Sequence, residues 1–191
     1  NIVISFGVGF SLMIIILIIL GFFGWLKPSF VWTVLILFLI IGIVDRNKWN
    51  FSIGLSKSSF PQLKKTELFI LLLLVSLSIL YIIPALSPTL DGDSLASYLL
   101  LSREYASNST ISVVDYAMGS SFPQNGQLIN TLGLLLKDQI VAQLLTVWSM
   151  GIFCVLIIYT IGRTLFSRQV TLIGILIWYG TYSVAFLAQS A

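Results

Sequence analysis

Histidine is absent from the 191 residues of this chain, and cysteine occurs once, as Cys154. Without histidine, the chain lacks the side chain that most often acts as a general base near neutral pH and as a zinc ligand. A single cysteine excludes an internal disulfide or a cysteine-based zinc site, and Cys154 is expected to pack within its apolar surroundings. Any chemistry therefore depends on carboxylates, hydroxyls, lysine, arginine or a bound ion, for which a divalent cation is the candidate.

Charged residues are also scarce, at 9% of the chain, whereas hydrophobic residues make up 58%. The mean hydropathy of +1.03 lies outside the range of soluble domains. The net charge of +3 comes from ten lysines and arginines that are scattered over polar connectors rather than gathered on one face. This distribution argues against a nucleic-acid partner. The composition predicts an all-α integral membrane protein.

Five apolar runs are candidates for membrane-spanning helices, because a helix that rises 1.5 Å per residue needs about 20 residues to cross a hydrocarbon core of about 30 Å. The runs cover residues 2–26, 29–44, 67–84, 139–161 and 170–188. The second run is short, and Lys27 extends it by snorkelling to the interface. We expect the five helices to form a single transmembrane domain within a longer chain, of which this sequence is a fragment.

Lysine and arginine are unevenly divided between the two sides that alternating spans would create. Three of the ten lie on the side of the first and third connectors, at Lys27, Arg103 and Lys137. The other seven lie in the second and fourth connectors: Arg46, Lys48, Lys57, Lys64, Lys65, Arg163 and Arg168. Cytoplasmic loops carry the excess of basic residues. The amino terminus is therefore predicted to be cytoplasmic, and the loop over residues 86–138 extracytoplasmic.

The loop over residues 86–138 is the only long segment that is neither a span nor a simple connector. Asp91 and Asp93 open it directly after an apolar run with a proline-rich exit. The sequence SLASYLLLSREY that follows has apolar residues at helical spacing, which predicts an amphipathic helix lying in the membrane interface. A turn signal at 122–126 precedes a second helical stretch over 127–136. The predicted fold is thus five spans, with two interfacial helices between the third and the fourth.

Three stretches of the chain carry a resemblance to a known family: DGDSLASYLLLSREY, SSFPQNGQLINTLGLLL and YTIGRTLF. Together they resemble the amino-terminal portion of bacterial polytopic GT-C glycosyltransferases related to the protein O-mannosyltransferase and lipid A aminoarabinose transferase group. The resemblance covers about residues 88–191, and it departs from the family at Ser97-Tyr98, where members often carry Tyr-His. It implies an acidic motif at the start of the first large extracytoplasmic loop, two juxtamembrane helices after it, and residence in the plasma (inner) membrane.

The resemblance also implies roles for individual residues of this chain. Asp91 or Asp93 would be the catalytic base that activates an acceptor hydroxyl, and a polyprenyl-phosphate sugar would be the donor. Glycosyl transfer to an alcohol needs a carboxylate for the acceptor proton and a cation or arginine for the leaving phosphate. We expect one of the two aspartates to be the base and the other a helix cap or metal ligand. The candidate substrate-binding residues are Tyr98, Arg103 and Gln124.

A second hypothesis is a non-catalytic accessory or structural subunit, whose helices fill a surface of a larger membrane complex. In that case the aspartates only cap a helix, and Arg103 only anchors it at the interface. A channel or transporter is less favoured, because the sequence places no charge within the interior of a predicted span. The expected partners are membrane lipid, the polyprenyl-phosphate sugar donor and, under the second hypothesis, other membrane subunits.

Overall fold

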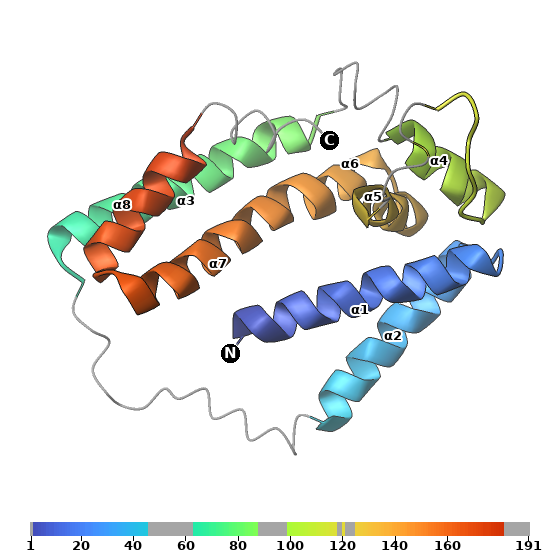
Figure 1. The fold of residues 1–191 in the computed structure, drawn as a ribbon, viewed down its shortest axis with the longest axis horizontal. Helices are drawn as coiled ribbons and strands as arrows, with labels where there is room; N and C mark the ends of the chain where they lie inside the picture. The colour runs from blue at the N-terminus through green and yellow to red at the C-terminus, as the bar shows by residue number, and fades with distance from the viewer. Residues whose placement is uncertain (1, 46–62, 88–98, 118–119, 121–124, 182–191) are drawn as a thin grey trace.

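The computed structural model describes residues 2–45, 63–87, 99–117, 120 and 125–181. Within these residues the chain is helical, with no strand, which confirms the all-α prediction. Figure 1 shows the order of the elements along the chain. They are α1 (Ile2–Phe22), α2 (Pro28–Asp45), α3 (Lys65–Ala85), α4 (Leu99–Asn108), α5 (Asn125–Leu136), α6 (Gln139–Gln143), the π-helix η2 (Leu144–Trp148), α7 (Ser149–Leu165) and α8 (Arg168–Tyr179).

Three helices of the described part are long and apolar enough to cross a membrane: Val3–Phe22, Lys65–Ala85 and Gln139–Leu165, the last being continuous through α6, η2 and α7. They coincide with the first, third and fourth predicted runs. The second run forms the shorter apolar helix Pro28–Val44. Of the fifth run, α8 contains the first part and ends at Tyr179. By length and composition these helices are consistent with a membrane protein, and the count of five spans stays a prediction.

The first helix ends earlier than the apolar run that predicts it, because the chain turns sharply at Gly24. This glycine has a φ of 74°, a conformation that residues with a Cβ rarely adopt. Pro28 then starts α2 at a position where the missing N–H leaves no hydrogen bond unmade. Figure 1 shows α1 and α2 as two diverging arms of one hairpin. Aromatic rings gather at the turn, where Trp25 stacks on Phe30 with centroids 5.7 Å apart.

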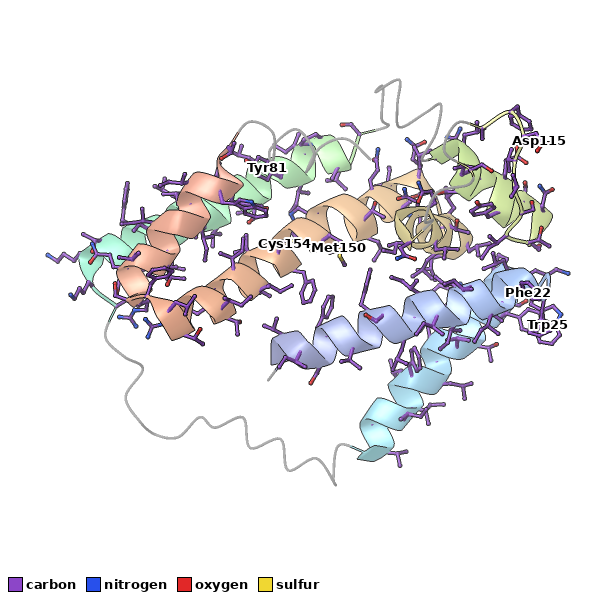
Figure 2. The ribbon with its side chains drawn as sticks, viewed as in Figure 1. Phe22, Trp25, Tyr81, Asp115, Met150 and Cys154 are labelled. Atoms are coloured by element: carbon purple, nitrogen blue, oxygen red, sulfur yellow. The ribbon has the colours of Figure 1, made fainter. Side chains whose placement is uncertain are left out.

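Backbone hydrogen bonds join this turn to the segment that follows α4. The N–H of Leu26 donates to the carbonyl of Ser109 (3.0 Å), and the N–H of Ile111 donates to the carbonyl of Gly21 (3.2 Å). Figure 2 shows Phe22 and Trp25 at the same end of the molecule as Asp115. The first connector and part of the loop over 86–138 therefore lie side by side.

An ion pair joins the starts of α3 and α8. Nη2 of Arg168 lies 2.5 Å from Oε2 of Glu67, a carboxylate that is only 4% exposed. The same oxygen accepts the backbone N–H of Lys64 (2.9 Å), which caps the first turn of α3. The second and fourth connectors therefore lead into adjacent helix ends. Glu67 is the first residue of the run predicted over 67–84 and is buried in the first turn of α3, so the expectation that no charge lies in the interior of a span stays a prediction.

The buried side chains form two clusters, which we call the α5 cluster and the α8 cluster. The α5 cluster gathers residues of α1, α2, α4 and α5 with the segment after α4: Met13, Leu17, Leu20, Leu26, Val31, Leu101, Tyr105, Val114, Ala117, Leu128, Leu132 and Leu135. The α8 cluster joins α3 to α8: Ile70, Leu74, Tyr81, Leu172, Ile175 and Tyr179. The continuous helix α6–η2–α7 runs from the first cluster to the second (Figure 1).

Helix α5 is more enclosed than the interfacial helix that the sequence predicts there. All seven residues from Gln127 to Gly133 are buried, including the polar ones. A Cβ on Gly133 would lie 2.2 Å from the Cα of Ala142, so the backbones of α5 and α6 touch at this glycine. Polar groups of α5 hydrogen-bond to Ser102 of α4 and to Thr146 of η2, so the polar side of α5 faces neighbouring helices.

The thiol of Cys154 does not fit the packing role expected of it. Cys154 is a free cysteine at an exposed position of α7 (Figure 2). An apolar run in a membrane helix predicts surroundings of low polarity, which lipid can supply as well as protein. Cys154 therefore lies on a face of α7 that the other described helices do not cover.

Candidate functional site

Four of the five residues that the sequence marks as a candidate site, Asp91, Asp93, Tyr98 and Gln124, lie outside the described residues. Their proposed roles stay predictions. The fifth, Arg103, is on α4. The candidate site is therefore described from α4 and α5, which directly follow the segments containing the other four, and from α6, which Arg103 contacts.

Arg103 lies on the exposed side of α4 and reaches across to the start of α6. Its Nη2 donates a hydrogen bond of 2.9 Å to Oε1 of Gln139, which is 36 residues further along the chain. A guanidinium group carries five N–H donors in a planar fork. The contact with Gln139 fixes one edge of this fork and leaves the side chain in an exposed position, where it can receive an anion.

Gln139 brings a second donor group to the same place. Its Nε2 is buried and makes no hydrogen bond within the part of the chain that the structure describes. A buried amide nitrogen without a partner costs free energy, so such a group is a candidate for contact with a ligand or an ordered water. Arg103 and Gln139 together form what we call the Arg103–Gln139 pair, a donor set suited to phosphate or carbonyl oxygens.

Buried hydroxyls fix α4, and with it Arg103, against α5. Oγ of Ser102 donates to the carbonyl of Gln127 (2.9 Å), and Oγ1 of Thr131 donates to the same carbonyl (2.7 Å). Ser102 and Thr131 are both fully buried. Ser102 precedes Arg103 directly on α4, so these bonds set the rotation of α4 about its axis and the direction in which Arg103 leaves it.

A further polar contact joins α5 to the π-helix η2. Oγ1 of Thr146 lies 2.7 Å from Oδ1 of Asn130 and 2.7 Å from the carbonyl of Ala142. Asn130 is 4% exposed. A π-turn widens a helix locally and occurs often at functional sites. The amide of Asn130 packs against this wider turn at Thr146, about 2.2 turns of helix after Asp138. Asp138 caps α6 by accepting the N–H of Val141 (3.0 Å).

The tyrosines near Arg103 remain protonated at neutral pH. Burial raises the pKa of Tyr105, whose ring packs in the α5 cluster. A hydrogen bond with Glu104 raises the pKa of the Tyr116 hydroxyl, with burial as a smaller cause. Neither phenol is therefore a general base, and Glu104 is occupied by Tyr116 and by the Nδ2 of Asn108 (3.2 Å).

Among the described residues, no group of three or more histidine, cysteine, aspartate or glutamate side chains could hold a metal ion. The possible divalent cation and the two aspartates of the acidic motif, Asp91 and Asp93, stay predictions from the sequence. The geometry of the described part can bind an anion at the Arg103–Gln139 pair.

Comparison with known proteins gives one relative. An uncharacterized protein of Shigella flexneri is 27% identical to this chain over 135 residues, which cover 71% of the chain and 65% of the relative. The chain thus spans about 65% of the length of the curated relative that it matches. No protein-family model matches the chain, and no solved structure matches it.

Sequence reasoning missed three residues that shape this site: Gln139, Asn130 and Gly133. Their signal was present, because each is a polar or small residue inside an apolar helical stretch. In a membrane protein, polar residues within such stretches face protein rather than lipid, and small residues mark close helix contacts. That rule identifies the positions, but the partner of each residue depends on how the helices pack.

Proposed function

We propose that this chain belongs to a membrane glycosyltransferase of the GT-C type, which transfers a sugar from a polyprenyl-phosphate donor to an acceptor hydroxyl on the extracytoplasmic face of the inner membrane. The resemblance of residues 88–191 to that family supports the proposal. The single structural observation that supports it is the Arg103–Gln139 pair. An exposed guanidinium, fixed by a glutamine and carried on the helix that follows the acidic motif, suits a phosphate that leaves in the reaction.

In this proposal the work is divided between two segments. Asp91 or Asp93 accepts the proton of the acceptor hydroxyl as the bond from the acceptor oxygen to the sugar carbon forms. Arg103 stabilises the negative charge on the polyprenyl phosphate as the bond between this phosphate and the sugar breaks. Tyr98 and Gln124 contact the substrates. Glutamine at 139 orients Arg103 and offers Nε2 as a further donor.

The proposed topology has five spans, a cytoplasmic amino terminus and an extracytoplasmic loop over 86–138. Two sets of contacts support it. The turn after α1 is hydrogen-bonded to the segment after α4. Arg168 and Glu67 join the ends of the second and fourth connectors. Odd-numbered connectors thus contact each other, as do even-numbered ones, which is what alternating spans require.

The proposal is tested in membranes that contain the protein in its natural length. Asp91→Asn and Asp93→Asn are made separately, and transfer of labelled sugar from polyprenyl phosphate to lipid or protein acceptors is followed. One of the two variants should lose about 100-fold or more in rate, since a general base contributes at least that factor. Asp115→Asn, at an exposed aspartate of the described connector, is the control and should transfer normally. Full activity of both test variants would refute the proposed base.

A non-catalytic subunit of a larger complex is the second candidate, and one observation favours it. The second half of α2 exposes apolar side chains all around, among them Leu39 at 62% and Val44 at 69% exposure. Lipid or another membrane protein can cover such a surface. Under this candidate, the chain would be recovered with a fixed partner from mild detergent, and neither aspartate variant would change any transfer activity.

A further inference from the structure

An apolar groove lies between the first half of α1 and the second half of α7, away from the Arg103–Gln139 pair. It has a volume of about 700 Å³, and its lining includes Gly7, Val8 and Leu12 from α1 with Phe153, Ile157 and Thr160 from α7. Figure 1 shows α4 beside the other end of α1. The groove is therefore separate from the site proposed for sugar transfer.

An aromatic contact joins α1 to α7 beside the groove. The ring of Phe153 lies 4.8 Å from that of Phe6, centroid to centroid. A Cβ on Gly7 would lie 3.3 Å from Cζ of Phe153, so the glycine lets the ring sit close to α1. Beyond this contact the helices leave exposed side chains such as Leu12 (47%) and Ile161 (56%) along the groove.

The two hydroxyls that line the groove are occupied within their own helices. Oγ of Ser11 donates to the carbonyl of Gly7 (2.9 Å), and Oγ1 of Thr160 donates to the carbonyl of Leu156 (2.8 Å). A polar ligand such as a sugar would have to compete for these hydroxyl protons. A hydrocarbon chain needs no hydrogen bond and matches the lining.

A positively charged residue, Arg163, follows Ile161, the last residue of α7 that lines the groove, by two positions. Arg163 is in the last turn of α7, three residues after Thr160, so the two side chains are neighbours on the helix surface. Arg163 is exposed, and its Nη1 donates only a long bond of 3.4 Å to the carbonyl of Phe166. Within the described part of the chain, no carboxylate forms an ion pair with it. Its charge is thus available to a ligand.

We propose that this groove binds an anionic phospholipid, with one acyl chain along α1 and α7 and the phosphate at Arg163. Both features of the ligand follow from the site: the hydrocarbon from the lining, and the negative charge from the arginine. The fourth connector, which contains Arg163, is predicted to be cytoplasmic. Anionic lipids are abundant in the cytoplasmic leaflet and attract basic residues near its surface.

The test measures lipid retention by the purified full chain in detergent, using native mass spectrometry. Phosphatidylglycerol and phosphatidylethanolamine with identical acyl chains are added in equal amounts. The unchanged protein should retain phosphatidylglycerol in preference, by about fivefold, the factor expected for one basic side chain near an anionic headgroup. Arg163→Gln should remove this preference while leaving overall lipid retention.

Two tryptophan variants separate the groove from the general lipid surface. Leu12→Trp fills the groove and should reduce retention of both lipids about fivefold or more, to the level of lipid that is bound non-specifically. Leu39→Trp makes the same change on α2, outside the groove, and should retain lipid as the unchanged protein does. Helix content by circular dichroism confirms that each variant is folded.

Several results would overturn the proposal. Equal retention of the two lipids by the unchanged protein would show that Arg163 does not select an anionic headgroup. Retention by Leu12→Trp that matches Leu39→Trp would remove the role of the groove. A dimer that only Leu12→Trp dissociates would show that a second copy of the chain, and not a lipid, occupies the groove. None of these measurements depends on sugar transfer, so the proposal and the proposed function can fail separately.

Discussion

The α5 cluster and the α8 cluster lie in one membrane protein but use polar groups in different ways. Around α5, hydroxyls and amides are buried between short helices, as with Ser102, Thr131 and Asn130. Around α8, apolar side chains of α3 and α8 pack together, and the polar contacts of the described residues include an ion pair at the helix starts and a tyrosine pair. In that pair, Oη of Tyr81 donates to the carbonyl of Tyr179 (2.9 Å), with ring centroids 5.1 Å apart.

The difference is related to the short helices next to α5, since α4 has 10 residues and α6 has 5, whereas α3 has 21. A long apolar helix satisfies its own backbone and can present only hydrocarbon to its neighbours. Short helices such as α4 and α6 contain a large share of terminal turns, whose groups need partners from elsewhere. Side chains supply these partners around α5, and they thereby fix the direction of Arg103. The α5 cluster is thus where a specific site can be built, and the α8 cluster is its scaffold.

The largest loss of stability is expected from a substitution at Gly133, where the backbones of α5 and α6 touch. Gly133→Val places side-chain atoms where the N and Cα of Ala142 lie, at 2.2–2.4 Å from the new Cβ. Backbone atoms cannot rotate away, so α5 and α6 must separate, at a cost of about 3 kcal/mol or more. Thermal unfolding of the detergent-purified protein measures the loss.

Gly126→Val is the matched control for this change. Gly126 is also in α5, but a Cβ there would meet nothing within 4 Å. Its variant should unfold within a few degrees of the unchanged protein. If both valine variants unfold at the same temperature, the close contact of α5 with α6 does not determine the stability of this cluster.

A smaller effect is expected from the ion pair that joins α3 to α8. Glu67→Leu leaves Arg168 partly buried beside an apolar helix, and the melting temperature should fall clearly. The double variant Glu67→Leu with Arg168→Met replaces both charges by hydrocarbon and should recover most of the loss, as replaced ion pairs often do. Additive losses in the double variant would show that the two charges do not act as a pair.

The smallest effect on stability, but a clear effect on function, is expected at the Arg103–Gln139 pair. Gln139→Leu removes one exposed hydrogen bond and a buried nitrogen without a partner, so stability should change by less than about 1 kcal/mol. The KM for the polyprenyl-phosphate donor should rise several-fold, because Arg103 loses its orientation. Steady-state transfer assays on the full-length protein in membranes measure this.

Ser102→Ala should affect stability more than donor binding, which is the opposite of what we expect for Gln139→Leu. It removes a buried hydroxyl that bonds to the carbonyl of Gln127, so stability should fall by about 1 kcal/mol. Donor KM should change less than in Gln139→Leu. If Gln139→Leu lowers the maximal rate and leaves KM unchanged, the glutamine does not act through binding of the donor.

The sequence predicted the helices well where apolar runs are long. The run over 67–84 became α3, Lys65–Ala85, and the stretch over 127–136 became α5, Asn125–Leu136. The first run was predicted to end at 26, whereas α1 ends at Phe22, because a glycine turn is hidden among apolar residues. Composition reports how apolar a segment is but not where its backbone turns.

The candidate site was predictable only in part. Arg103 was identified from its position after the acidic motif, and its exposure fits the proposed role. Gln139 was assigned simply to the start of a span, and its contact with Arg103 joins residues 36 positions apart. Asp91, Asp93 and Gln124, outside the described residues, remain sequence predictions. A sequence pattern predicts which residues share a face of one helix, whereas this site depends on contacts between different helices.

What the sequence determined by itself is the class of protein and the location of its helices. In a bilayer every backbone group needs an internal partner, so a long apolar run has almost no alternative to a helix. What only the tertiary structure decided is which polar groups meet: Arg103 with Gln139, and Glu67 with Arg168, 101 residues apart. These pairings depend on how helices of nearly uniform apolar surface pack, and this packing is set by a few close contacts such as that of Gly133 with Ala142.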